Sequence, residues 1–278
     1  MFYLCGSGLA GVNTGQALVH LPTEARRNLV GSSAGALAVA GLAGGDLEGL
    51  SRLVESTGWP ASSTKLKRAL EEWCRRQVGS DEGDPPPSFR QWAESTLEDF
   101  ACFAYDCLKG HPVLFSPLAT PDASVAEVLT AAASWPPAVP SGVAVGGRAH
   151  CDAEYVVSPF LLHRFLRPSR VVIIRGTSRS FAEACAPHAG LSWMCRIAEL
   201  HGRLMDTLSS SCSSFVAKLP GPGPLEAVLC HRSHPRPPSV LLPTIWLLIA
   251  MYGRLLASEP PRLCRRQRRQ RKQVIPRW

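Results

Sequence analysis

The segment 28–45, NLVGSSAGALAVAGLAGG, constrains the fold more than any other part of the chain. A short apolar run ends at Gly31, and a run of small apolar residues follows Gly35. Between them lies the pattern G-x-S-x-G, which places a serine, Ser33, on a tight turn between a buried strand and a helix. Glycines flank such a serine because a side chain at either position would collide with the crowded backbone. The segment therefore predicts an α/β fold with Ser33 as its exposed nucleophile.

A second glycine-rich turn follows the apolar residues 2–5 at the start of the chain. Gly6, Gly8 and Gly11 spell G-x-G-x-x-G, a pattern that also occurs in dinucleotide-binding folds. Those folds need an acidic residue at the end of their second strand to bind the ribose, and the sequence has none near Gly31. The amides of this turn can instead stabilise the oxyanion that forms when a serine attacks an ester. The two turns then belong to one site.

Length and charge limit the class of protein. With 278 residues, 45% of them apolar, the chain can bury a substantial single core, so a disordered or fibrous protein is not expected. The formal net charge of +8 is confined to the C-terminal tail, where eight basic and no acidic residues follow position 261. In the rest of the chain, 22 basic residues balance 22 acidic ones, so the charge of the body does not indicate a nucleic-acid ligand.

The ten cysteines are scattered along the chain, with no C-x-x-C pair and no histidine at the spacing of a metal site. We interpret them as reduced, mostly buried side chains of an intracellular protein rather than as a disulfide framework. The N-terminus has no basic region ahead of a long apolar run, so a signal peptide is not predicted.

Hydrophobic periodicity and turn residues predict the remaining elements. Strands are expected at 2–5, 28–31 and 170–176, and as a pair joined by a Gly-Gly turn within 142–151. Helices are expected at 12–21, 34–45, 46–57, 62–78, 89–110 and 124–134, and a loop at 79–88. Asp46 is the expected N-cap of its helix, Ser124 and Glu127 form an expected capping box, and Gly110 is expected to end helix 89–110.

The order of the motifs resembles the patatin-like phospholipase domain, the family of plant patatins, adiponutrin and adipose triglyceride lipase. Its members carry a glycine-rich turn, a G-x-S-x-G before a small-residue helix, and a later aspartate, usually in D-G-G or D-G-A, that completes a Ser–Asp dyad. The matching stretch here is HCDAEYVVSPF, residues 150–160. The resemblance covers residues 2 to about 175 and implies a three-layer α/β/α fold with a mostly parallel central sheet.

The resemblance also implies a serine lipid acyl hydrolase that cleaves fatty acyl esters of phospholipids or acylglycerols through an acyl-serine intermediate. The site residues it implies are the nucleophile Ser33, the base Asp152, the oxyanion-hole amides of Gly6, Ser7 and Gly8, and the supporting glycines Gly11, Gly31 and Gly35. It implies no metal and no cofactor. A carboxylate bonded to the serine can accept its proton directly, and a water-excluding site would raise the carboxylate pKa from its usual value of about 4.

The sequence departs from the family pattern after Asp152, where Ala153 and Glu154 stand in place of glycines. A positive φ at Ala153 would cost about 1 kcal/mol or more and would shift Asp152 away from Ser33. The alternative function is therefore a catalytically degenerate relative that binds lipid or membrane. Glu154 is interpreted as a solvated side chain rather than as a substitute base. The histidines fit no triad pattern; those considered are His20, His111, His150, His188 and His201.

The C-terminal part is interpreted as an appendage. The predicted units are an acyl hydrolase domain at 1–218, a Pro-rich linker at 219–239, an apolar helix at 240–257 and a basic tail at 258–278. Pro243 interrupts the apolar stretch, which is too short to span a bilayer, so it is expected to lie on a membrane surface or in the core. The segment 262–272 also fits a nuclear-import signal or an RNA-binding arm, although nucleic acid is not specifically signalled. The expected location is cytoplasmic or at the membrane periphery.

Overall fold

The computed structural model describes residues 1–6, 13–19, 26, 28–58, 63–96, 98–135, 139, 141–154, 170–176, 213–219 and 225–231. The strands are β1 (Phe2–Leu4), β2 (Leu29–Ser32), β3 (Phe100–Asp106), β4 (His111–Phe115), β5 (Val143–Val145), β6 (Arg148–Asp152), β7 (Arg170–Gly176), β8 (Ser213–Leu219) and β9 (Leu225–His231). The helices are the 3₁₀ helix η1 (Asn13–Leu18) and the α-helices α2 (Ala34–Ala43), α3 (Leu47–Ser56), α4 (Ser63–Val78), α5 (Phe89–Ser95) and α6 (Val125–Ala132). The fold is of the α/β class, as predicted.

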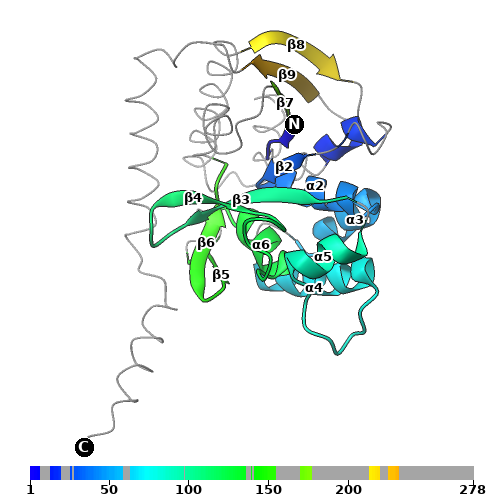
Figure 1. The fold of residues 1–278 in the computed structure, drawn as a ribbon, viewed down its shortest axis with the longest axis vertical. Coiled ribbons are helices and arrows are strands. Elements are labelled where there is room, and N and C mark those ends of the chain that lie inside the picture. Colours follow the sequence, from blue (N-terminus) through cyan, green and yellow to red (C-terminus); the bar gives the residue numbers. More distant parts are fainter. Residues whose placement is uncertain are drawn as a thin grey trace, which may run out of the picture.

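Within the described ranges, nine strands form one sheet in the order β5-β6-β3-β2-β1-β7-β9-β8, with β4 paired to β3 (Figure 1). The centre is parallel, because β1 pairs with β2 and β7, and β2 with β3, in the same direction. Both ends are antiparallel. The predicted mostly parallel sheet is therefore mixed. Short turns join β3 to β4 and β5 to β6, and short turns connect only antiparallel neighbours.

The helices α2 to α6 gather beside the β2–β3 part of the sheet, where they build the larger hydrophobic core (Figure 1). Its fully buried large side chains include Leu37, Leu50, Trp73, Trp92 and Leu129, one from each of these five helices. A second apolar cluster contains no residue of the described helices; it includes Tyr3, Val30, Phe103, Tyr105, Cys151 and Ile173. The described helices do not cover this second cluster, so the second helical layer of the three-layer fold remains a prediction.

Helix boundaries in the first core follow the capping residues that the sequence predicts. The Asp46 carboxylate accepts the Gly49 N–H at 3.0 Å and begins α3. The Ser124 hydroxyl accepts the Glu127 N–H at 3.4 Å and begins α6. The Glu127 carboxylate pairs with Lys67 of α4 at 2.8 Å, so it links two helices in place of the predicted return contact to Ser124.

The predicted long helix at 89–110 is wrong. Helix α5 ends at Ser95, and the chain continues as β3, which pairs with β2, β4 and β6 in the middle of the sheet. The strand sequence FACFAYD is rich in aromatic residues, which favour strands, but its apolar residues also fit a helical spacing. Gly110 does not end a helix; it has φ +71° in the turn between β3 and β4.

Two other elements differ from the predictions. The helix predicted at 12–21 is the short 3₁₀ helix η1 where it is described. The predicted linker at 219–239 contains β9, which pairs with β7 and β8, so the sheet continues past the predicted domain boundary at 218. The sequence of β9, LEAVLCH, is apolar enough to join a sheet although proline-rich segments flank it.

The predicted apolar helix at 240–257 and basic tail at 258–278 lie outside the described residues, so both remain predictions. No helix in the part of the chain that the structure describes is long and apolar enough to cross a membrane.

Candidate active site

Ser33 lies at the junction between β2 and α2, in a backbone conformation that few residues other than glycine adopt. Its backbone has φ +53° and ψ −134°, and positive φ is uncommon for a residue other than glycine. Its side chain makes no cap hydrogen bond to α2, so the hydroxyl serves no helix-capping role. This is the turn that the G-x-S-x-G pattern predicts for a nucleophile, but the prediction that Ser33 is exposed is wrong, since only 7% of it is accessible.

The two glycines of this motif are required by close backbone contacts. A Cβ atom on Gly31 would lie 2.3 Å from the carbonyl oxygen of Gly35. A Cβ atom on Gly35 would lie 2.0 Å from the carbonyl oxygen of Leu4 in β1. The absence of side chains therefore lets α2 pack directly against the strands that carry the site, as the sequence predicts.

Gly6 follows β1, the parallel neighbour of β2, and its backbone lies against Ser33. A Cβ atom on Gly6 would be 2.3 Å from Ser33 Cβ and 2.6 Å from Ser33 Oγ. The first glycine turn therefore meets Ser33 at Gly6. Ser7, Gly8 and Gly11 lie outside the described residues, so their predicted contributions to the oxyanion hole and its support remain predictions.

Asp152 ends β6 and is hydrogen-bonded to Ser33. The Ser33 hydroxyl donates to the Asp152 carboxylate, which also accepts the Glu154 N–H at 2.8 Å. The Asp152 N–H donates to the Ser134 carbonyl at 3.0 Å and fixes the end of the strand. Only 1% of Asp152 is exposed. The structure therefore brings together the two residues that the resemblance pairs as a dyad.

Burial changes the acidity of this carboxyl group. Loss of solvent raises the pKa of Asp152 to about 7, even though the hydrogen bonds from Ser33 and the Glu154 amide lower it. A carboxylate with a pKa near neutrality is a far better proton acceptor at pH 7 than an ordinary aspartate. The sequence predicts this increase in the Asp152 pKa.

Ala153 does not strain the backbone beside Asp152. Among the described residues other than glycine, only Asn28 and Ser33 have positive φ. The strain that would move Asp152 away from Ser33 is therefore absent at this position, and the hydrogen bond between them is intact.

The interpretation of Glu154 as a solvated side chain is wrong, since only 5% of it is exposed. Its carboxylate accepts the Gly6 N–H at 3.1 Å, the Ser32 hydroxyl and the Cys5 thiol. Ser32 Oγ in turn lies 2.5 Å from the Tyr3 hydroxyl. Glu154 thus completes a buried polar network beside the Ser33–Asp152 pair.

Burial and the nearby Asp152 charge raise the pKa of Glu154 to about 8, against the effect of its hydrogen bonds. Burial followed by the charge of Glu154 also raises the pKa of Tyr3 well above its usual value, so the phenol stays protonated. No local sequence signal locates Glu154, because it follows the end of β6 at Asp152 and its partners come from segments far away in the sequence.

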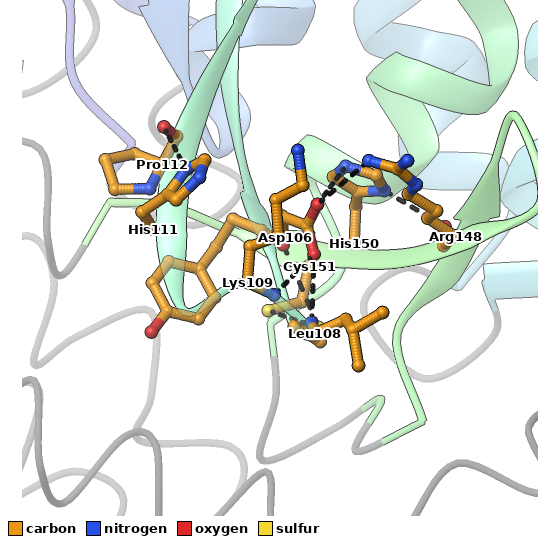
Figure 2. Close-up of polar contacts among 10 residues, drawn as sticks. Asp106, Leu108, Lys109, His111, Pro112, Arg148, His150 and Cys151 are labelled. Carbon is orange, nitrogen blue, oxygen red and sulfur yellow. Dashed lines mark hydrogen bonds and ion pairs between the residues drawn. The ribbon is translucent and has the colours of Figure 1, made fainter.

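Another buried carboxylate, Asp106, lies at the end of β3 beside β6 (Figure 2). It accepts the N–H groups of Leu108 and Lys109, both at 2.9 Å. Figure 2 shows His150 and Arg148 facing it, with His150 Nε2 3.9 Å and Arg148 Nη1 4.0 Å from Asp106 Oδ2. His150 is therefore directed to Asp106 and not to the dyad.

The other candidate side chains lie elsewhere. His111 is exposed and contacts the neighbouring Pro112 carbonyl, while His20, His188 and His201 fall outside the described residues. The cysteines whose side chains are described are reduced thiols, namely Cys5, Cys74, Cys102, Cys107 and Cys151. No group of three or more His, Cys, Asp or Glu side chains in the described ranges is arranged to hold a metal ion.

No family model matches this chain, and no curated protein is significantly similar to it. The resemblance to patatin-like domains therefore rests on three short motifs and their order.

Proposed function

We propose that this protein is a serine acyl hydrolase in which Ser33 is the nucleophile and Asp152 the base. The observation that carries the proposal is the hydrogen bond from Ser33, on its positive-φ turn, to the buried Asp152 carboxylate. As Ser33 Oγ attacks an ester carbonyl, its proton passes to Asp152 and then to the departing alcohol. Water releases the acyl group from Ser33 by the reverse sequence. A histidine is not needed for these transfers.

The oxyanion formed by this attack needs hydrogen-bond donors close to Ser33. The Gly6 amide belongs to the backbone in contact with Ser33, and the ten-residue helix α2 begins immediately after Ser33. The first amides of α2 and the helix dipole favour negative charge at this end. Ser7 and Gly8 are the further donors that the resemblance implies.

The substrate class is taken from the resemblance. We propose a patatin-like α/β/α fold and fatty acyl esters of phospholipids or acylglycerols as substrates, corresponding to phospholipase A or acylglycerol lipase activity. Segment 240–272, with its apolar stretch and cations, would provide peripheral contact with a membrane. We propose a location in the cytoplasm or at the membrane periphery.

The test is labelling by a fluorophosphonate together with hydrolysis of a short-chain nitrophenyl ester and of phospholipid vesicles. The wild-type protein is expected to react, and Ser33→Ala is expected to lose both labelling and turnover. Ser56→Ala is the matched control because Ser56 is an exposed serine at the end of α3. Full labelling or turnover in a folded Ser33→Ala variant would exclude Ser33 as the nucleophile.

A non-catalytic lipid-binding protein is the second candidate, and Glu154 is the observation that favours it. Its carboxylate already takes the hydrogen bond of the Gly6 amide, which an active hydrolase would offer to the oxyanion. Wild-type protein that binds phospholipid vesicles but never reacts with the fluorophosphonate, at any pH between 6 and 9, would support this candidate over the enzyme.

A further inference from the structure

We propose that Glu154 is a gate on the oxyanion hole: its carboxylate occupies the Gly6 N–H in the resting protein and must leave it before Ser33 can react. This inference rests on the proposed function. It assigns to Glu154 a regulatory contact at the site, since the proton transfers of the reaction belong to Ser33 and Asp152.

Glu154 and a substrate oxyanion compete for one hydrogen-bond donor. The Gly6 N–H has a single proton, and Glu154 Oε2 accepts it at 3.1 Å. Gly6 also lies so close to Ser33 that a Cβ atom there would be 2.6 Å from Ser33 Oγ. The Gly6 amide can therefore donate to a substrate oxyanion or to the Glu154 carboxylate, but not to both at once. The carboxylate is thus an internal substitute for the oxyanion.

Hydrogen bonds hold Glu154 in this position. Its carboxylate accepts hydrogen bonds from Gly6, Ser32 and Cys5. Among the described residues, the titratable groups that act on it are Tyr3 in β1, Cys5 directly after β1, and Asp152 at the end of β6. None of these three is a cation. Within this part of the chain, the Glu154 charge is therefore stabilised by hydrogen bonds and opposed by Asp152.

The reaction requires different protonation states of the two carboxyl groups. The base Asp152 must be ionised for attack, whereas Gly6 is released most easily when Glu154 is neutral. The pKa of Asp152 is about 7 and that of Glu154 about 8. Activity should therefore rise as Asp152 ionises and fall as Glu154 ionises, with the two apparent values belonging to the interacting pair.

The first experiment compares pH profiles of fluorophosphonate labelling and ester hydrolysis for wild-type protein, Glu154→Gln and the control Glu48→Gln. Glu48 is an exposed glutamate in the first turn of α3. Wild type and the control should show a bell-shaped profile. Glu154→Gln should keep the acid limb and lose the alkaline one, so that at pH 9 it is about tenfold faster than wild type. The same alkaline fall in folded Glu154→Gln, or a slower reaction at pH 9, would overturn the gate.

The second experiment does not depend on catalysis. In ¹⁵N-labelled protein, the Gly6 amide chemical shift should titrate with a midpoint near 8 in wild type and in Ser33→Ala, and should lose this titration in Glu154→Gln. A Gly6 shift that does not respond to Glu154 would overturn the gate even in an active hydrolase. A Gly6 shift that titrates, in a protein whose variants all fail to react with the probe, would overturn the proposed function and with it the gating role.

Discussion

The two buried carboxylate clusters of this protein have pKa values that are shifted in opposite directions. Asp106 ends β3, whereas Asp152 ends its antiparallel neighbour β6 and is followed by Glu154. Burial by itself raises the pKa of each carboxyl group. At Asp106 the amides of Lys109 and Leu108, then His150 and Arg148, outweigh burial and lower the pKa. At Asp152 and Glu154 burial outweighs the hydrogen bonds, and the pKa values rise to about 7 and about 8.

The comparison shows that the partners of a buried carboxyl group decide its role. Asp106 accepts two amides of the turn after β3 and faces the Arg148 guanidinium and the His150 imidazole, an arrangement that keeps it ionised and orders the turn. Asp152 and Glu154 face hydroxyl groups, a thiol and each other. The carboxyl groups whose pKa values lie near neutrality are therefore those of the second cluster, which also contains the strained Ser33.

The largest expected effect separates the two aspartates by activity. Asp152→Asn should lower ester turnover by about 10²- to 10⁴-fold, because the amide cannot accept the Ser33 proton. Asp106→Asn should leave turnover per folded molecule close to wild type and lower the free energy of unfolding by about 1–3 kcal/mol, through the loss of a charged acceptor. Turnover and urea unfolding measured on both variants check this. Equal loss of turnover in the two variants would contradict the division of roles.

The next effect tests the contact between Gly6 and the nucleophile. Gly6→Ala places a Cβ atom 2.3 Å from Ser33 Cβ, so the serine must move, and turnover should fall about a hundredfold. Gly83→Ala is the matched control, because an added Cβ there meets no atom within 4 Å. Fluorophosphonate labelling rates on both variants give the answer. Unchanged labelling of Gly6→Ala would show that Gly6 does not lie against Ser33.

The two clusters should also respond oppositely to pH. The folded pKa values of Asp152 and Glu154 are raised, so the folded protein binds more protons than the unfolded chain between about pH 4 and pH 8. These groups therefore reduce stability as pH rises through that window, by at most about 1.4 kcal/mol per pKa unit. Asp106 has a lowered pKa, so its contribution is present above about pH 4 and is lost as pH falls through the folded value.

Unfolding in urea at pH 5 and pH 9 measures this response. The variant Asp152→Asn/Glu154→Gln should lose most of the decrease in unfolding free energy between the two pH values, and Asp106→Asn should keep it. An unchanged decrease in the double variant would show that neither buried carboxyl group has a raised pKa.

The smallest effect tests which partners keep Asp106 ionised. Arg148 is 4.0 Å from Asp106 and its side chain is 55% exposed, so Arg148→Ala should lower the free energy of unfolding by no more than about 0.5 kcal/mol. The two turn amides would then supply most of the stabilisation. A loss above 2 kcal/mol in the same urea experiment would instead assign that role to the arginine.

Local signals predicted the elements that depend on nearby residues. Asp46 and Ser124 begin helices as expected, because an N-cap bonds to amides within the same turn. The Gly-Gly turn between β5 and β6 was also predicted from local residues, because glycines readily adopt the positive φ values of this turn. The strand β3 was mistaken for a helix because its apolar spacing fits both structures, and its pairing with β2 and β6 involves residues far away in the sequence.

For the site, the sequence by itself determined the strained turn at Ser33 and its close glycines, since G-x-S-x-G restricts the backbone through local sterics. The motif order then paired Ser33 with Asp152 as an expectation. Only the tertiary structure decided that Glu154 is buried, that it binds the Gly6 amide, and that both carboxyl groups have raised pKa values. Burial and charge coupling arise when β1, β2 and β6 meet, and no local pattern records them.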